Sequence, residues 1–121
     1  MGVQSYKDLI AWQKAMDLVV VIYQATTSFP ADERFGLTIQ IRRAAVSVPS
    51  NIAEGQGRGP GQDFVRFLSI ARGSLQEVDT QLVLAVRLGS LKQSAYDPLS
   101  NLLVEVAKLI NGLIRSIPTN Y

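Results

Sequence analysis

The longest amphipathic stretch of the chain spans residues 62–88 and reads QDFVRFLSIARGSLQEVDTQLVLAVRL. Its apolar positions recur every three or four residues: Phe64, Phe67, Ala71, Leu75, Val78, Leu82 and Val86. This spacing places the seven side chains on one face of an α-helix, whereas a half-buried strand would alternate every second residue. The stretch therefore predicts a long helix with one buried face.

Three further segments show the same helical spacing. The first spans about residues 5–27, and the second opens after Pro30 with Asp32 as its expected N-cap. The fourth starts near Asp97, followed by a first-turn proline, and stops at Pro118. Their expected core positions are Leu9, Trp12, Met16, Val19 and Tyr23 in the first segment, Leu37, Ile41, Ala44, Val48 and Ile52 in the second, and Leu99, Leu102, Val106, Ile110, Leu113 and Ile117 in the fourth.

The breaks between the segments are short, at residues 28–30, 55–61 and 89–94. Short connections make consecutive helices antiparallel neighbours. We therefore expect an all-α fold, an up-and-down antiparallel four-helix bundle that forms a single domain over residues 1–121.

Composition excludes several kinds of chemistry. The chain has no histidine and no cysteine, which removes the usual zinc sites, cysteine nucleophiles and triads with an imidazole base. The remaining carboxylates and lysines form no recognisable catalytic pattern, so we expect no enzyme, no metal and no cofactor. The longest uncharged run, residues 18–31, is too short to cross a bilayer as a helix. Without a visible leader, the expected location is the cytoplasm.

The net charge of +2 is unevenly distributed. Residues 34–72 contain six arginines against Glu54 and Asp63, so this block carries +4. Arginine presents a planar set of donors that suits phosphate and carboxylate groups. Two interpretations stay open, a phosphate-binding surface or solvated helix faces with ion pairs inside the bundle.

The antiparallel arrangement sorts these arginines into two groups. Arg43 should lie level with Glu77 across the second and third helices. Glu54 should lie level with Arg66 in the same way, so we predict two structural polar pairs. The others have no level-matched acidic partner and are the candidates for nucleic-acid contact: Arg34, Arg42, Arg58 and Arg72.

Two segments are more apolar than a monomeric bundle requires. Residues 18–23 are apolar all the way round the first helix. The fourth segment adds three apolar residues outside its expected core stripe: Leu103, Leu109 and Ile114. A helix at the surface of a monomer keeps one face in water. We therefore expect a homo-oligomer held together by the first and fourth helices.

The run at residues 39–55, IQIRRAAVSVPSNIAEG, resembles the signature of the four helix bundle protein family. Members of that family are encoded within intervening sequences of bacterial large-subunit ribosomal RNA genes and elsewhere in bacterial genomes. Residues 67–77 resemble the family's third helix, and residues 12–15 resemble its first. The positions that match its motifs are Arg42, Arg43, Asn51, Glu54, Gly73, Ser74 and Glu77.

The family is similar to the accessory protein of diversity-generating retroelements, a basic pentameric barrel that binds nucleic acid and its reverse transcriptase. The resemblance thus implies a pentamer, with RNA or DNA and a reverse transcriptase as possible partners. Two functions stay open. The first is a non-enzymatic oligomer that binds nucleic acid without reading its sequence. The alternative is a scaffold that docks a partner protein such as a reverse transcriptase and binds no nucleic acid itself.

Overall fold

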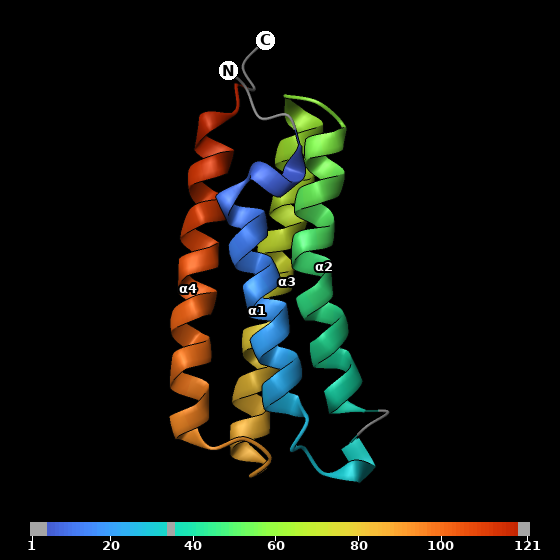
Figure 1. Ribbon diagram of the computed structural model, residues 1–121, viewed down its shortest axis with the longest axis vertical. Coiled ribbons are helices and arrows are strands. Elements are labelled where there is room, and N and C mark those ends of the chain that lie inside the picture. The colour runs from blue at the N-terminus through green and yellow to red at the C-terminus, as the bar shows by residue number, and fades with distance from the viewer. Residues whose placement is uncertain (1–4, 34–35, 119–121) are drawn as a thin grey trace.

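The computed structural model describes residues 5–33 and 36–118. Within these ranges the chain forms four long helices and two short 3₁₀ turns, and no strand. The helices are α1 (Ile10–Thr26), α2 (Leu37–Gly57), α3 (Gln62–Arg87) and α4 (Gln93–Ser116), and the turns are η1 (Tyr6–Asp8) and η2 (Ala31–Glu33). The helices lie side by side and run alternately up and down (Figure 1). The expected antiparallel four-helix bundle is confirmed.

One hydrophobic core runs along the inside of the bundle. Each helix packs against its neighbour in sequence, and α4 also packs against α1. The largest side chains that are completely buried come from all four helices: Leu18, Ile22, Ile41, Ile52, Leu68, Leu82 and Ile110. Among the described helices, none is long and apolar enough to cross a membrane.

The buried face of α1 differs from the predicted one. The residues that face the core are Ala11, Ala15, Leu18, Ile22 and Thr26. Of the expected stripe, Leu9 is buried just before the helix, whereas Met16 is 39% exposed and Tyr23 41% exposed. Residues 18–23 are apolar on every side, so the hydrophobic pattern leaves the orientation of this helix undetermined. Small alanines select the face that can approach the neighbouring helices most closely.

Helix α4 begins four residues before the predicted start at Asp97. Lys92 is extended, and its carbonyl accepts from the N–H groups of Ala95 and Tyr96, both at 3.0 Å. Pro98 therefore lies inside the helix, where it removes only one backbone hydrogen bond near the helix start. This start and the packing place Leu103 in the core, which corrects its assignment to an outer face. Leu109 and Ile114 are partly buried against the core.

Helix α2 begins at Leu37, and its N-cap is Gly36 rather than Asp32. Asp32 lies in the preceding turn η2. The nearby carboxylate that reaches the helix is that of Glu33, whose Oε1 accepts from the Leu37 N–H at 3.5 Å. The predicted N-cap is wrong because the turn η2 comes between Pro30 and the start of the helix. An acidic side chain of this turn, that of Glu33, nevertheless accepts from the first residue of the helix.

Helices α2 and α3 form the most extensive contact in the bundle, and small residues permit it. A Cβ atom added to Gly55 would lie 2.8 Å from Phe67 Cβ and 2.9 Å from Phe64 Cδ1. Further along, the hydroxyl groups of Ser47 and Ser74 hydrogen-bond directly across the two helices. We call this contact the α2–α3 seam.

Candidate functional site

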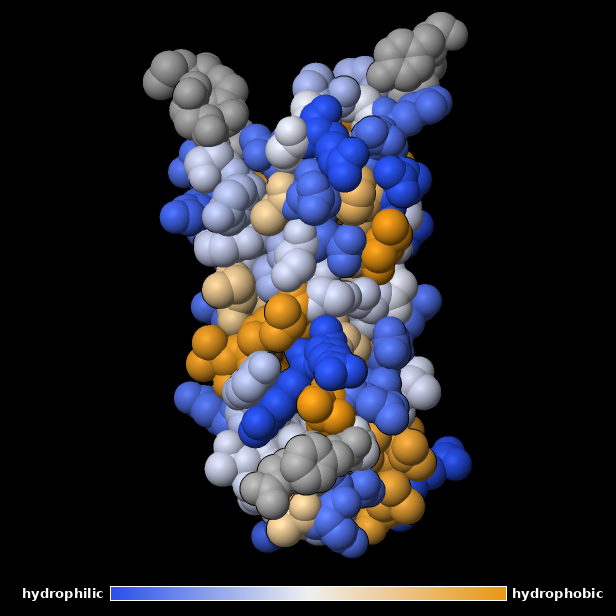
Figure 2. Space-filling model, turned by 90° about the vertical axis from the view of Figure 1, so that its right-hand side faces the viewer, coloured by the Kyte–Doolittle hydropathy of each residue, from blue (hydrophilic) through white to orange (hydrophobic). Residues whose placement is uncertain are grey.

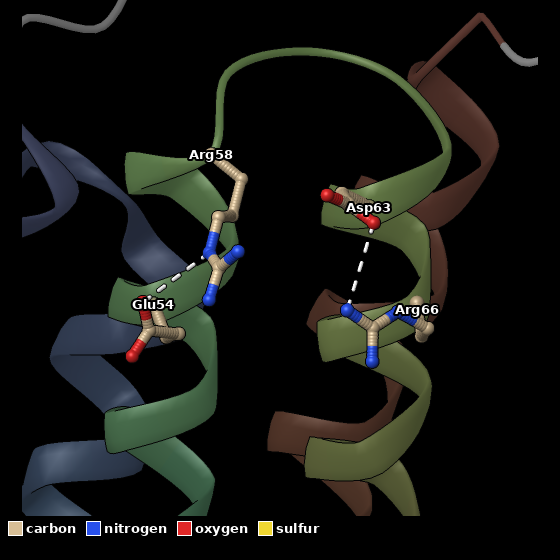
Figure 3. Close-up of polar contacts among 4 residues, drawn as sticks. All are labelled: Glu54, Arg58, Asp63 and Arg66. Atoms are coloured by element: carbon tan, nitrogen blue, oxygen red, sulfur yellow. Dashed lines mark ion pairs between the residues drawn. The ribbon is translucent and has the colours of Figure 1, made fainter.

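The glycine-rich end of the α2–α3 seam holds two exposed ion pairs. Arg58 Nε lies 3.4 Å from Glu54 Oε2, one turn away on α2, and Arg66 Nη2 lies 3.6 Å from Asp63 Oδ1 on α3. Each pair stays on its own helix (Figure 3). The predicted pair between Glu54 and Arg66 is therefore wrong, because an oppositely charged neighbour one turn away on the same helix is reached first.

The two arginines of this end share one aromatic ring. The guanidinium carbon of Arg58 lies 5.0 Å from the centroid of Phe67, and that of Arg66 lies 4.8 Å from it. The side chain of Arg58 is 47% exposed and that of Arg66 is 59% exposed. A cation over an aromatic face at an exposed site contributes about 0.5–1 kcal/mol. The ring thus lies within 5.0 Å of two positive groups at the surface.

The other predicted polar pair is also wrong. Arg43 and Glu77 are both exposed, and no ion pair joins them in the part of the chain that the structure describes. Instead, Gln81 Nε2 donates to Glu77 Oε2 at 3.4 Å. The Ser47–Ser74 hydrogen bond shows that Arg43 and Glu77 do lie at matching heights on the two helices. The two charged side chains, however, stand outside the α2–α3 seam, which small residues fill.

Arg42 connects α2 to the last turn of α1. Its Nε donates to Thr26 Oγ1 at 2.9 Å and its Nη2 donates to the Tyr23 carbonyl at 3.2 Å. Its guanidinium carbon lies 4.5 Å from the Tyr23 ring centroid. A cation is favourable there because the carbonyl groups of a final helical turn lack helical partners. The partners of Arg42 are thus neutral oxygen atoms rather than a carboxylate.

Of the four arginines proposed for nucleic-acid contact, the three that the structure describes do not form one cluster. Arg72 donates from Nη1 to Asn111 Oδ1 at 2.8 Å and so connects α3 to α4. Arg42 and Arg58 lie near opposite ends of α2, about 24 Å apart along the helix axis at 1.5 Å per residue. Arg34 lies outside the described residues. A single chain therefore presents Arg42, Arg58 and Arg72 at three different contacts between helices.

Sequence reasoning missed a polar contact between α3 and α4. Tyr96 Oη donates to Asp79 Oδ1 at 2.7 Å. This hydrogen bond raises the pKa of Tyr96 above its usual 10.0, because loss of the phenolic proton breaks it and leaves two negative charges together. A tyrosine near the start of a helix, seventeen residues after an aspartate on an antiparallel neighbour, is too weak a signal to be found from sequence.

An apolar groove lies between α1 and α2. It has a volume of about 330 Å³, and no charged residue among the described ones lines it; its walls include Tyr6, Trp12, Met16, Val19, Val46 and Pro49. The rings of Tyr6 and Trp12 meet edge to face at a centroid distance of 5.3 Å. Met16, Val46 and the neighbouring Val20 are exposed. We call these three residues the α1–α2 surface.

A second apolar area lies on α3. Ile70, Leu84 and Leu88 are exposed. Leu84 and the C-cap residue Leu88 lie one turn apart at the end of α3, and Ile70 lies on the same side about 21 Å away along the helix. Glu77 lies between them on the same side. We call these three apolar residues the α3 stripe. The face of the bundle around α2 carries orange areas toward both of its edges, with hydrophilic residues between them (Figure 2).

The model of the 23S rRNA-intervening sequence protein family matches residues 7–112. The chain belongs to this family. Among solved structures, the chain is similar to a protein of unknown function from the S23 ribosomal protein family of Bacteroides thetaiotaomicron. Its crystal structure has a TM-score of 0.78 and 24% sequence identity, over 88% of this chain and 100% of that chain. The likeness shows a shared fold. No curated protein matches the chain.

The family match names no reaction, so the chemistry of this chain has to be argued from its own residues. Over residues 5–33 and 36–118, no group of three or more acidic side chains is arranged to hold a metal ion. What the fold does present are two exposed apolar areas and a set of arginines bound to neighbouring side chains. These features suit association with other macromolecules.

Proposed function

We propose that this family member is a non-enzymatic scaffold whose copies associate with one another through two apolar surfaces. The observation that carries the proposal is that the α1–α2 surface and the α3 stripe lie on different helices of the same chain. Exposed apolar groups that lie close together, as Leu84 and Leu88 do, mark sites of macromolecular contact. The proposed occupant is a second copy of this chain, because each copy has an exposed apolar surface that can cover the other one.

The position of the two surfaces favours a ring. If the α3 stripe of one copy covers the α1–α2 surface of the next, the contact is head to tail, and such contacts close into rings when the rotation permits. The resemblance to the retroelement accessory protein favours five copies. An assembly of this kind would hold a partner protein, with a reverse transcriptase as the partner that the resemblance suggests.

Light scattering on the purified chain tests self-association. We expect a particle several times heavier than the 13.2 kDa chain. Val20→Asp and Leu88→Asp should each lower that mass, because a buried unpaired carboxylate opposes association. Val104→Asp is the matched control, since Val104 is also exposed on a helix but belongs to neither surface. A monomeric unsubstituted chain would overturn the proposal.

Nucleic-acid binding is a second candidate, favoured by the two exposed arginines over Phe67. Exposed ion pairs such as those of Arg58 and Arg66 are weak, so phosphate groups can replace Glu54 and Asp63 as their partners. A ring would repeat this pair once per copy and add the charge of each chain. Contacts of this kind would bind phosphates without reading sequence.

Fluorescence anisotropy with labelled RNA and DNA at two salt concentrations tests this candidate. Affinity should fall as salt rises, with a logarithmic slope of about −0.9 per phosphate neutralised on duplex DNA. Arg58→Ala and Arg66→Ala should weaken binding evenly across sequences and flatten the slope, while Arg87→Ala on another part of α3 should change little. If an intact oligomer binds neither RNA nor DNA at low salt, nucleic-acid binding is contradicted and only the scaffold proposal remains.

A further inference from the structure

A separate pocket lies where the end of α1 meets the start of α2. It has a volume of about 320 Å³, and its lining includes Phe29, Pro30, Thr38 and Arg42. This volume is at the lower end of the range typical of small-molecule sites. The pocket shares no residue with the α1–α2 surface or the α3 stripe.

Thr38 contributes a buried hydroxyl group that has no partner among the described residues. The residue is 7% exposed, and its Oγ1 makes no hydrogen bond with any described residue. Buried polar groups are nearly always paired. Thr38 therefore offers the pocket both a donor and an acceptor.

Arg42 supplies a positive group held in a fixed position on the same pocket. Thr26 Oγ1 and the Tyr23 carbonyl take its Nε and one of its Nη2 positions, and the Tyr23 ring lies against the guanidinium. No described residue accepts from Nη1. Thr26 cannot turn its own proton toward a ligand without breaking its bond to the Ile22 carbonyl. The donors left for a ligand are thus the Nη1 edge of Arg42 and the Thr38 hydroxyl.

We propose that this pocket binds a small carboxylate ligand that has an apolar body. The carboxylate would accept from the guanidinium and from Thr38, the pairing for which a planar arginine is suited. The apolar body would pack against Phe29 and Pro30. Asp32 and Glu33 lie in the adjoining turn η2, and their negative charges disfavour a ligand with more than one charge. The ligand is therefore a monocarboxylate rather than a phosphate.

Such a carboxylate has two sources, a free acid or the C-terminus of a peptide. Saturation-transfer NMR distinguishes them with benzoate as one probe and N-acetylphenylalanine as the other, and the method tolerates a large oligomer. We expect at least one probe to bind, and inorganic phosphate not to displace it. Stronger binding of N-acetylphenylalanine assigns the pocket to a peptide terminus, and stronger binding of benzoate assigns it to a free acid.

Variants place the binding in the pocket. Thr38→Val keeps the shape and removes the hydroxyl, so the affinity should fall about tenfold, whereas Thr38→Ser should restore most of it. Arg42→Lys keeps the charge and should also weaken binding, which gives a second readout if the valine variant does not fold. Thr80→Val and Arg87→Lys are the matched controls and should bind like the unsubstituted chain.

Three results would overturn the proposal. The first is that neither probe binds, so that Thr38 pairs only with an ordered water. The second is that the probes bind equally well to the unsubstituted chain and to the folded Thr38 and Arg42 variants. The third is that phosphate displaces the probe and binds more tightly than either carboxylate. None of these results bears on self-association, because the pocket lies outside both apolar surfaces.

Discussion

Gly55 has no side chain, and this lets α2 approach α3 closely. Replacing it with alanine would bring a Cβ atom to 2.8 Å from Phe67 Cβ and 3.3 Å from the Phe64 carbonyl. Alanine is favoured over glycine in a helix by about 1 kcal/mol, but forcing an extra carbon into a packed contact costs about 1–3 kcal/mol. We expect Gly55→Ala to lower the free energy of unfolding, measured by urea denaturation.

Gly73 provides the control for that substitution. It lies in the middle of α3, and a Cβ atom added there would meet nothing within 4 Å. Gly73→Ala should therefore raise the free energy of unfolding by about 0.5–1 kcal/mol. If both variants were stabilised alike, the close approach of α2 and α3 at Gly55 would be contradicted.

Tyr96 gives a second prediction at the scale of one residue. Tyr96→Phe removes the hydrogen bond to Asp79 and should lower the free energy of unfolding by about 1 kcal/mol. The pKa of Tyr96 is raised in the folded chain, chiefly by that bond. Its stabilising effect is therefore fully present below pH 10.0 and is lost as the pH rises through the folded value.

The measurement that checks this compares urea denaturation of the two chains across neutral and alkaline pH. The difference in stability should be constant near neutrality and shrink toward zero above the folded pKa. A difference that grows with alkaline pH would mean that the phenolate form is the one that the fold stabilises.

At the scale of the helix, the α2–α3 seam predicts which side chains are energetically coupled. Ser47 and Ser74 hydrogen-bond across it, so Ser47→Ala and Ser74→Ala should be non-additive by about 0.5 kcal/mol or more in a double-mutant cycle. Arg43→Ala and Glu77→Ala should be additive, because no ion pair joins the two side chains. The cycles use unfolding free energies, and coupling only in the charged pair would reverse our description of the seam.

The helices also show what their sequences could and could not predict. The five core positions expected for α2 are all buried, because its apolar residues form a single stripe. Helix α1 has two possible apolar stripes, and its orientation depends on neighbours that the sequence does not locate. Helix α4 begins earlier than predicted because Pro98 lies in its second turn instead of its first, at the cost of one backbone hydrogen bond.

The candidate site was harder to predict than the fold for a related reason. Side chains such as Arg42 and Arg72 find neutral partners, Thr26, Asn111 and a backbone carbonyl, which carry no charge signal in the sequence. The prediction pairs charges that lie at the same height on two helices, whereas Arg58 and Arg66 each pair with a carboxylate about one turn away along the chain. The pocket beside Thr38 depends on the path of the connection between α1 and α2, which no periodic pattern describes.

At the scale of the whole molecule, a mixing experiment separates a ring from a symmetric dimer. Val20→Asp leaves the α3 stripe intact, and Leu88→Asp leaves the α1–α2 surface intact. In a head-to-tail assembly, equal amounts of the two variants have one intact contact per pair, so we expect a particle of about twice the chain mass. Each variant alone should be a monomer. Light scattering measures both.

A symmetric dimer gives a different result. If copies met only through the α1–α2 surface, Leu88→Asp would associate as well as the unsubstituted chain, and mixing would add nothing. The Val104→Asp chain serves again as the control, since it keeps both surfaces.

The α2–α3 seam also has a consequence for the order in which the chain folds. Its two helices are joined by a short connection, so the contact between them closes a small loop and costs little chain entropy. Helices α1 and α4 come from opposite ends of the chain and meet only by closing a much longer loop. A hairpin of α2 and α3 is therefore the expected folding nucleus, with φ-values higher at Ser47 and Ser74 than at Leu18 or Ile110. Substitutions in the seam should slow folding, whereas those where α1 meets α4 should mainly speed unfolding.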